Sequence, residues 1–366
     1  MRAGGAIVTF TTNTFIAVTD LTYDSQDIVI DGTTVTVNGL HSFNSMQVSR
    51  AGTLSLGGGA TLNVGGALDV SSNSVVLCQG TNVSSQVNGQ WVGGGVTINA
   101  GTANIDANSK ISADGQGYLG GTQGAKGSGP GGGGGSGGYD AAGAGYGGPG
   151  GTQSGAMPGQ PYGSATRPTD SGSGGGGAGG AEPGGSSGGA IRLLAAQTFA
   201  LDGIITANGD PGGGYSGAGS GGSIYVTADS LTGAGKFTAN GGSRTGMVNA
   251  DGSGGGGRIT VYLLDLSSNP TNQMTASAGG GSAQMGSVLV AHNQSFVRLQ
   301  KTSNSFDLEW VTFPPHVYQL EYTTNLVPLN WINLGGPITA TNYTTIVSDT
   351  VGTDPHRFYR NNLPVQ

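Results

Sequence analysis

Aspartates are the residues of this sequence that could carry out acid–base chemistry on a substrate. Cleavage of a polysaccharide needs two carboxyl groups about 5–10 Å apart, or a Lys or Arg base beside neutralising carboxylates. The candidates in the repetitive part of the chain are Asp106, Asp114, Asp202, Asp210, Asp229, Asp251 and Asp265. Their spacing singles out no pair, so the sequence shows no recognisable catalytic constellation.

Asp114 is better explained by a turn than by catalysis. It follows a short β run, at a place that Asn208, Asn240 and Ser277 occupy in three later copies of the same pattern. Asp and Asn are frequent in turns because they hydrogen-bond their own backbone and tolerate the left-handed conformation. Calcium could bind at such Asp-Gly and Asn-Gly turns, but no dense acidic loop accompanies them.

Metal, nucleophile and phosphate sites are not indicated either. Zinc needs His and Cys at fixed spacing, and the histidines are far apart without Cys partners: His41, His292, His316 and His356. Cys78 ends an apolar run with no His close in sequence, so we expect a buried thiol that acts as a small hydrophobe. Glycine-rich strings that imitate nucleophile elbows or phosphate loops abound, but none follows a strand and opens a helix. We therefore expect no metal and no cofactor.

Charge is scarce in this chain. Only 9% of the 366 residues are charged and the net charge is −7, whereas about 25% are charged in ordinary globular domains. The 13 Lys and Arg residues form no basic stripe, so nucleic acid and anionic membranes are not expected partners. Arg192 and Arg258 stand in equivalent β runs, and we expect both to be solvated. No apolar stretch reaches the ~20 residues of a membrane span, which predicts no membrane insertion.

Residues 1–92 are expected to form short β-strands. Apolar and polar residues alternate in runs divided by Gly, Asn or Asp turns. Examples are residues 28–30, 34–37, 46–48, 53–56, 61–64 and 67–70. Strands at a spacing of roughly eight to ten residues suit either an antiparallel sandwich or the coils of a parallel β-helix.

Residues 93–297 repeat a two-part unit. A first β run follows Gly-Gly at Gly94, Gly188, Gly221 and Gly256, and a second run follows at residues 111, 205, 237 and 274. Such strands cannot bury a face alone, but stacked copies share one core. The simplest stack is a right-handed parallel β-helix-like body with glycine-rich insertions.

A long glycine-rich insertion, residues 115–189, separates the first two copies. Glycine makes up 34 of its 75 residues. The segment is either a flexible loop or a layer of extended polyglycine II strands, in which only glycine allows such close backbone approach. Similar segments at 210–222, 241–257 and 279–286 favour the ordered layer, because they share one place in the repeat.

Tyrosines in and near the glycine-rich segments are the candidate ligand-binding residues. They are Tyr118, Tyr139, Tyr146, Tyr162, Tyr215 and Tyr225. Aromatic rings provide stacking faces for sugars, and the surrounding Ser, Thr and Asn can hydrogen-bond them. The alternative is that these rings fill gaps in the glycine-rich layer.

Residues 298–366 differ in composition, with little glycine and many aromatics. Short alternating strands predict a small fibronectin-III-like β-sandwich, with Trp310 and Trp331 in its core. The segments 308–310, 318–326, 330–331, 334–341 and 357–360 resemble a C-terminal module of large secreted proteins from Verrucomicrobia and related bacteria. The glycine-rich repeats, including residues 162–166, resemble the β-helical parts of the same proteins.

The resemblance implies an extracellular or cell-surface location and a binding or scaffolding role, with no catalytic motif to carry over. Residues 1–7 lack the apolar segment of a signal peptide, so a secreted protein would have a truncated N-terminus here. We expect a non-enzymatic surface protein for adhesion, fibre assembly or glycan binding. Its partners would be extracellular polysaccharide or further copies of itself. The alternative is a β-helical polysaccharide lyase or glycoside hydrolase.

Overall fold

The computed structural model is all-β. It describes residues 6–152, 155–180, 182–245, 251–265, 273–302, 305–328, 330–350 and 356–362. The chain divides into two compact units. The first comprises residues 1–261 and 269–289, and the second comprises residues 262–268 and 290–366. The division expected from the sequence, into 1–92, 93–297 and 298–366, stays a prediction.

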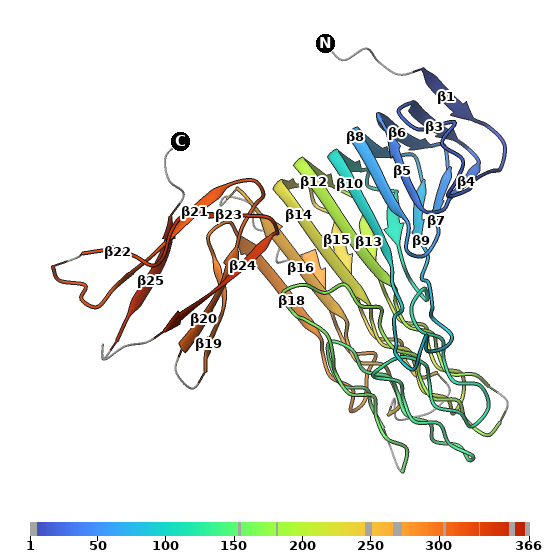
Figure 1. Ribbon diagram of the computed structural model, residues 1–366. Helices are drawn as coiled ribbons and strands as arrows, with labels where there is room; N and C mark the ends of the chain where they lie inside the picture. The colour runs from blue at the N-terminus through green and yellow to red at the C-terminus, as the bar shows by residue number, and fades with distance from the viewer. Residues whose placement is uncertain are drawn as a thin grey trace. The chain divides into compact units, whose positions relative to one another are not determined.

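The first unit contains two long sheets (Figure 1). The first sheet has, in order across it, β1 (Ile7–Phe10), β3 (Asp27–Asp31), β6 (Ser45–Ser49), β8 (Thr61–Val70), β10 (Val96–Ile105), β12 (Ala190–Leu201), β14 (Ser223–Thr232), β16 (Arg258–Leu263) and β18 (Ser287–His292). A further strand, β5 (Leu40–Phe43), also pairs with β8. The pairs from β1 to β14 are parallel.

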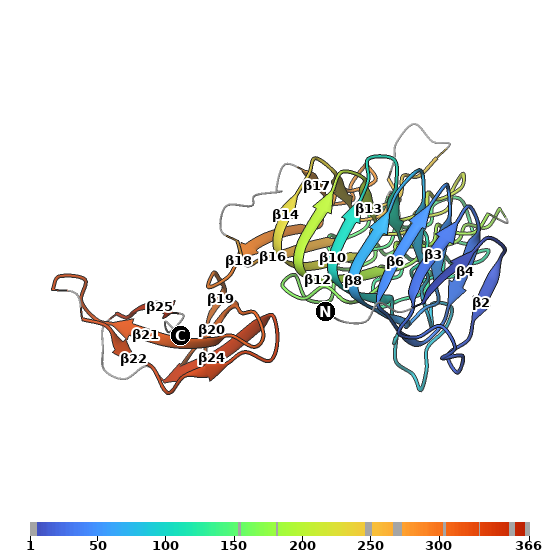
Figure 2. The same cartoon turned by 90° about the horizontal axis from the view of Figure 1, so that it is seen from above.

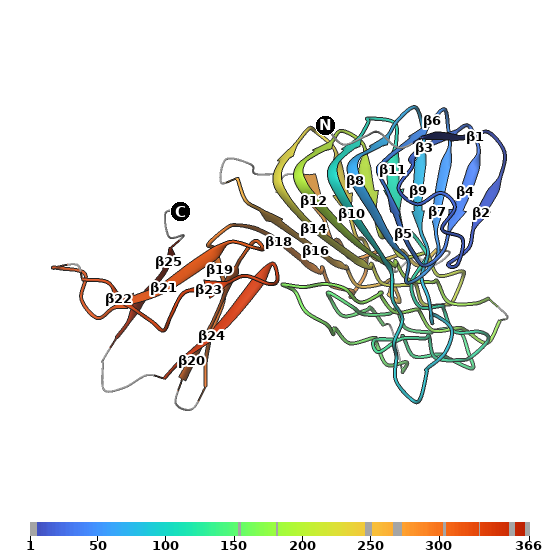
Figure 3. The ribbon, with the colours of Figure 1, turned by 45° about the horizontal axis from the view of Figure 1, so that its top comes forward.

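The second sheet is parallel throughout its described pairs. Its strands are β2 (Thr14–Ile16), β4 (Thr34–Val37), β7 (Thr53–Leu56), β9 (Val75–Cys78), β11 (Lys110–Ser112), β13 (Ile204–Thr206), β15 (Lys236–Thr238) and β17 (Met274–Thr275). Apart from the consecutive strands β5 and β6, which both belong to the first sheet, the strands from β1 to β18 alternate between the two sheets along the chain (Figures 2 and 3). Such long parallel sheets are compatible with a parallel β-helix-like body, and they exclude the antiparallel sandwich for residues 1–92.

Alternating apolar residues form the core between the sheets. Ile98 pairs with Leu193, and Leu193 pairs with Val226 in the next strand; all three side chains are buried. Ile111 and Ile205 make the same kind of ladder in the second sheet. Because a strand places alternate side chains on opposite faces, each predicted run buries one face and leaves the other outward. The first halves of successive repeats pair in register in the first sheet, and the second halves pair in register in the second sheet.

The glycine-rich segments are held by backbone hydrogen bonds. They lie together beyond the ends of the strands (Figure 1). Consecutive N–H groups donate to carbonyls of different neighbouring segments, at 2.9–3.0 Å: Gly174 to Ser128, Gly175 to Gly185, Gly176 to Ala142 and Gly177 to Ala125. A β-strand sends its N–H groups alternately to two neighbours. This segment has acceptors on more sides than a sheet offers.

Close approach of these backbones leaves no room for side chains. A Cβ on Gly174 would lie 2.0 Å from the Leu119 oxygen, and one on Gly177 would lie 1.9 Å from the Thr122 oxygen. Non-bonded Cβ atoms essentially never approach another atom this closely. Glycine is therefore required here by the distance to the next segment.

The second unit has two small antiparallel groupings of strands. One contains β19 (Phe296–Lys301), β20 (Ser305–Val311) and β24 (Thr344–Thr350), and the other contains β21 (Val317–Thr323), β22 (Ile332–Asn333), β23 (Ile338–Thr339) and β25 (Phe358–Asn362). Their shared core includes Trp310 and Tyr318. Trp331 is only half-buried, and its ring centroid lies 4.4 Å from the guanidinium carbon of Arg360. The predicted core position of Trp331 is therefore more exposed than expected.

Replacement of a glycine inside the layer should destabilise the first unit. For Gly176→Ala, the new Cβ would lie 2.0 Å from the Gly134 oxygen, so we expect the free energy of unfolding to fall by about 1–3 kcal/mol or more. Gly137→Ala is the control, because no atom lies within 4 Å of its Cβ position. Denaturant unfolding of both variants measures the difference, and equal stability would contradict close packing.

Cys78 should be unreactive in the folded protein. Burial raises the pKa of its thiol to about 12, and its side chain is buried in the core. At pH 8 the thiolate fraction is then about a thousandfold smaller than for a free cysteine. Labelling with a thiol reagent should be negligible in buffer and complete in denaturant. Rapid labelling of the native protein would show that the thiol is accessible.

Candidate functional site

Most of the tyrosines proposed as ligand contacts are inside the protein. Tyr118, Tyr146 and Tyr225 are buried, and Tyr162 is half-buried. The Tyr118 hydroxyl accepts a hydrogen bond from the Gly93 N–H at 2.6 Å. Burial raises the pKa of the Tyr118, Tyr146 and Tyr162 hydroxyls. These rings fill space beside the glycine-rich segments, as the alternative interpretation of the sequence predicts.

Arg258 is the cation at the centre of the buried tyrosines. Its guanidinium carbon lies 5.3 Å from the centroid of the Tyr146 ring. One of its terminal nitrogens donates to the Tyr162 carbonyl at 2.8 Å and the other to the Ser287 hydroxyl at 3.1 Å. Only 9% of Arg258 is exposed. The expectation of a solvated side chain is wrong for Arg258, because the insertion covers the outer face of β16.

Tyr139 and Tyr215 are the two exposed members of the set. The exposed fractions are 64% and 37%. Their ring centroids lie 4.6 Å apart and the rings are tilted by 58°. Tyr139 comes from the long insertion and Tyr215 from the segment 210–222, so tertiary structure brings them together. We call these two residues the exposed tyrosine pair.

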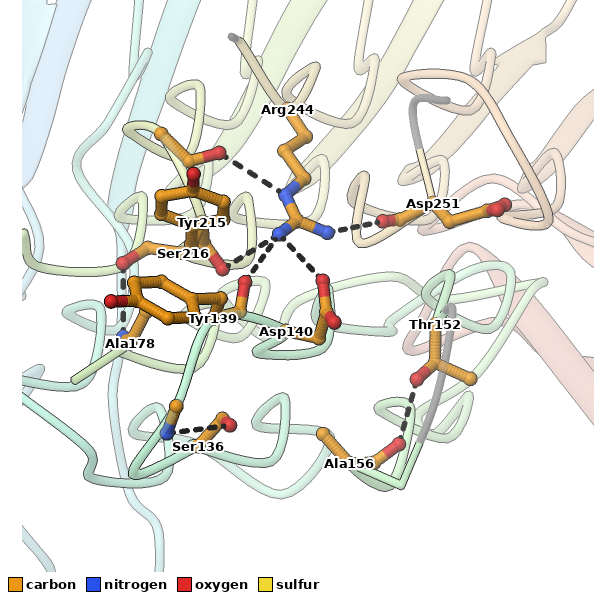
Figure 4. Close-up of polar contacts among 12 residues, drawn as sticks. Ser136, Tyr139, Asp140, Thr152, Ala156, Ala178, Tyr215, Ser216, Arg244 and Asp251 are labelled. Atoms are coloured by element: carbon orange, nitrogen blue, oxygen red, sulfur yellow. Dashed lines mark hydrogen bonds and ion pairs between the residues drawn. The ribbon is translucent and has the colours of Figure 1, made fainter. Parts of the chain in front are cut away.

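Arg244 holds the exposed tyrosine pair in place (Figure 4). One of its terminal nitrogens donates to the carbonyls of Tyr139 and Tyr215, at 2.8 and 3.0 Å, and approaches the Asp140 carboxylate at 3.2 Å. The other terminal nitrogen donates to the Asp251 carbonyl at 3.1 Å, and Nε donates to the Gly214 carbonyl at 3.3 Å. The Arg244 side chain is fully buried. One guanidinium therefore joins three glycine-rich segments.

Two carboxylates flank the exposed tyrosine pair. Asp140 follows Tyr139 directly, and a third of its side chain is exposed. Glu182 is exposed, and a Cβ on Gly214 would lie 2.3 Å from its Oε2, so its carboxylate lies beside the residue before Tyr215. Aromatic faces next to carboxylates can stack on sugar rings and accept hydrogen bonds from sugar hydroxyls.

Asp114 begins a ladder of side chains, each of which hydrogen-bonds to the next copy of the repeat; we call each copy, with its pair of strands, a coil. Its Oδ1 accepts the Asn208 N–H at 2.6 Å, Asn208 Oδ1 accepts the Asn240 N–H at 2.8 Å, and Asn240 Oδ1 accepts the Ser277 N–H at 2.8 Å. The sequence predicted bonds to each residue's own backbone. The side chains instead satisfy the backbone of the next coil, so their role is structural but not local.

Asp210 is the carboxylate closest to a catalytic arrangement. Partial burial raises the pKa of its carboxyl, and the charge of Asp114 raises it further. A Cβ on Gly115 would lie 2.6 Å from Asp210 Oδ2. The partner Asp114 also accepts the Thr206 hydroxyl at 2.7 Å, so its oxygens are already engaged within the fold.

Among the described residues, no group of three or more His, Cys, Asp or Glu side chains is arranged to hold a metal ion. That part of the chain also contains no helix long and apolar enough to cross a bilayer.

Arg244 is the residue that the sequence analysis missed. The signal that could have found it is an isolated Arg within a glycine-rich segment of a chain in which only 9% of residues are charged. A charge retained where side chains are otherwise excluded indicates a guanidinium that bonds to backbone carbonyls.

Removal of the Arg244 guanidinium should loosen the exposed tyrosine pair. Arg244→Met leaves several carbonyls without donors, so we expect a loss of about 1–3 kcal/mol in stability. The Ala141 N–H, which donates to the Tyr215 carbonyl at 3.1 Å, should exchange faster with solvent. Arg50→Met is the control, because Arg50 pairs with Asp31 but is 74% exposed and such pairs contribute little. Unchanged exchange at Ala141 in Arg244→Met would contradict this role.

Comparison with known proteins returned no match: no protein-family model, no curated protein and no solved structure resembles the chain closely enough to be assigned to it. The resemblance to glycine-rich secreted proteins therefore stays a prediction.

Proposed function

We propose that the protein is a non-enzymatic extracellular or cell-surface protein that binds glycans and acts in adhesion. The observation that carries this proposal is the exposed tyrosine pair fixed by the buried Arg244. Solvent-exposed aromatic rings contribute little to the free energy of folding, so their exposure is better explained by binding. Rings held in a fixed position lose little conformational entropy when a sugar binds. The ligand would stack on Tyr139 and Tyr215 and hydrogen-bond to Asp140 and Glu182.

The architecture supports a role as a rigid support for this surface. We infer that the parallel sheets form a right-handed β-helix and that the glycine-rich segments form a polyglycine II layer. The N–H groups of residues 174–177 donate to several neighbouring segments. This pattern favours polyglycine II, because that helix has three residues per turn and its backbone groups point to neighbours on several sides. We further infer that the second unit is a fibronectin-III-like sandwich.

Self-assembly into fibres is a second non-enzymatic role with an observation in its favour. Within the described residues, β1 pairs only with β3 and β2 only with β4, so each presents a free edge. Ile7 and Phe15 on these strands are exposed. Open parallel edges with apolar residues favour pairing with another chain. Filaments in electron micrographs of the purified protein would support this role.

Polysaccharide cleavage is the enzymatic alternative, and Asp210 is the residue that favours it. A carboxyl with a raised pKa beside a second carboxylate is the arrangement expected of a general acid. Asp114 accepts hydrogen bonds from neighbouring coils, which favours a structural assignment. Release of new reducing ends or unsaturated sugars, abolished by Asp210→Asn, would establish cleavage and overturn the non-enzymatic proposal.

Loss of the exposed tyrosine pair should weaken glycan binding without unfolding the protein. We expect the Tyr139→Ala and Tyr215→Ala double variant to bind its best glycan on an array at least about tenfold more weakly, because two stacking faces are removed. Phe15→Ala is the matched control, since Phe15 is also an exposed aromatic ring, at 59%. Equal binding by the double variant, or no glycan binding by the wild-type protein, would refute the proposal.

A further inference from the structure

The outer face of the first sheet carries a row of hydrogen-bonding side chains. Ser42, Asn63 and Asn99 stand in register on β5, β8 and β10. The Asn63 amide donates to the Ser42 hydroxyl at 3.1 Å, and the Asn99 amide donates to the Asn63 carbonyl oxygen at 2.8 Å. All three side chains remain at least partly exposed. The row therefore offers amide and hydroxyl groups to a ligand lying flat on the sheet.

Arg192 stands on the same face, one row along. Thr97 of β10, Arg192 of β12 and Tyr225 of β14 are paired in register. The guanidinium carbon of Arg192 lies 5.7 Å from the centroid of the Tyr225 ring. Its Nε is buried and has no hydrogen-bond partner. No ion pair among the described residues involves Arg192.

A pocket of about 210 Å³ opens at Arg192. The starts of β10 and β12 line it, together with Thr169 of the long insertion. The insertion covers the strands beyond this point, where the Thr260 hydroxyl donates to the Ala165 carbonyl at 2.7 Å. Arg192 therefore lies where the covered part of the face ends and the open part begins.

The comparison with Arg258 shows what Arg192 lacks. Arg258 lies beneath the insertion and donates to carbonyl and hydroxyl oxygens of the chain. Burial raises the pKa of the half-buried Asp170 carboxyl, and the positive charge of Arg258 partly opposes that rise. Arg192 has the same fork of donors but a buried N–H without an acceptor. Within the described residues no guanidinium nitrogen of Arg192 donates a hydrogen bond, and the side chain is partly exposed. Its terminal nitrogens could therefore pair with an external anion.

We propose that Arg192 binds a carboxylate of an acidic polysaccharide whose sugar hydroxyls bond to the row of Ser42, Asn63 and Asn99. A guanidinium matches a carboxylate with two parallel hydrogen bonds. Amide side chains both donate and accept, as sugar hydroxyls do. The site is a different surface from the exposed tyrosine pair, so this inference does not depend on that proposal.

Binding to polygalacturonate tests the site, with neutral dextran and poly-L-glutamate for comparison. In calorimetric titration of the full chain, we expect the wild-type protein to bind polygalacturonate and not dextran. Arg192→Gln should weaken that binding about tenfold through loss of a charge-assisted pair. Lys236→Gln is the matched control: it makes the same charge change at an exposed residue of β15 in the other sheet, and its binding should be unchanged.

A second variant tests the site with Arg192 in place. Thr97→Asp puts a carboxylate directly across from Arg192 on the neighbouring strand, so an internal ion pair should replace the ligand and weaken binding similarly. Circular dichroism and thermal unfolding confirm that each variant is folded. The Tyr139→Ala and Tyr215→Ala double variant should keep the Arg192-dependent affinity, which separates the two sites.

Several outcomes would overturn the inference. Wild-type protein that does not bind polygalacturonate, or Arg192→Gln and Thr97→Asp variants that bind it normally, would exclude the site. An equal loss in Lys236→Gln would show that attraction by general charge explains binding. Equally tight binding of poly-L-glutamate would assign the surface to acidic peptides instead of glycans.

Discussion

Backbone hydrogen bonds between coils are the interaction on which this structure depends. Each strand of the first unit pairs with the equivalent strand of the next coil, and the glycine-rich segments bond to one another beyond the strands. Buried N–H and C=O groups must be paired, or the fold loses free energy for each one. Small side chains join the same network: the Ser173 hydroxyl accepts the Gly131 N–H, and the Ser216 hydroxyl accepts the Ala178 N–H.

The same constraint explains where the charged residues lie. Where glycine-rich segments pack closely, a buried guanidinium is stable if its donors meet backbone carbonyls. Arg244 and Arg258 satisfy this condition and join segments that are distant in sequence. Arg192 does not, since its Nε lacks an acceptor. This contrast separates the structural arginines Arg244 and Arg258 from Arg192, which we propose binds a ligand.

The strands and the repeat could be predicted from the sequence because both are local patterns. Alternation with period two marks runs such as 28–30 and 61–64, which lie within β3 and β8. The candidate site could be predicted only in part. Tyr139 and Tyr146 lie in the same glycine-rich insertion, yet Tyr146 is buried and Tyr139 is exposed. Which ring faces solvent depends on how distant glycine-rich segments pack, and no local pattern records that.

The sequence by itself determined that the chain is all-β, that its two-part repeats stack, and that residues 115–189 could have no ordinary side-chain core. These follow from residue type and period, which act over a few positions. Only the tertiary structure decided which groups meet. It joined Tyr139 to Tyr215 through Arg244, and it directed Asp114 to the backbone of Asn208 in the next coil. Asp114 and Asn208 are 94 positions apart and Tyr139 and Arg244 are 105 positions apart, so these contacts arise only when the chain packs.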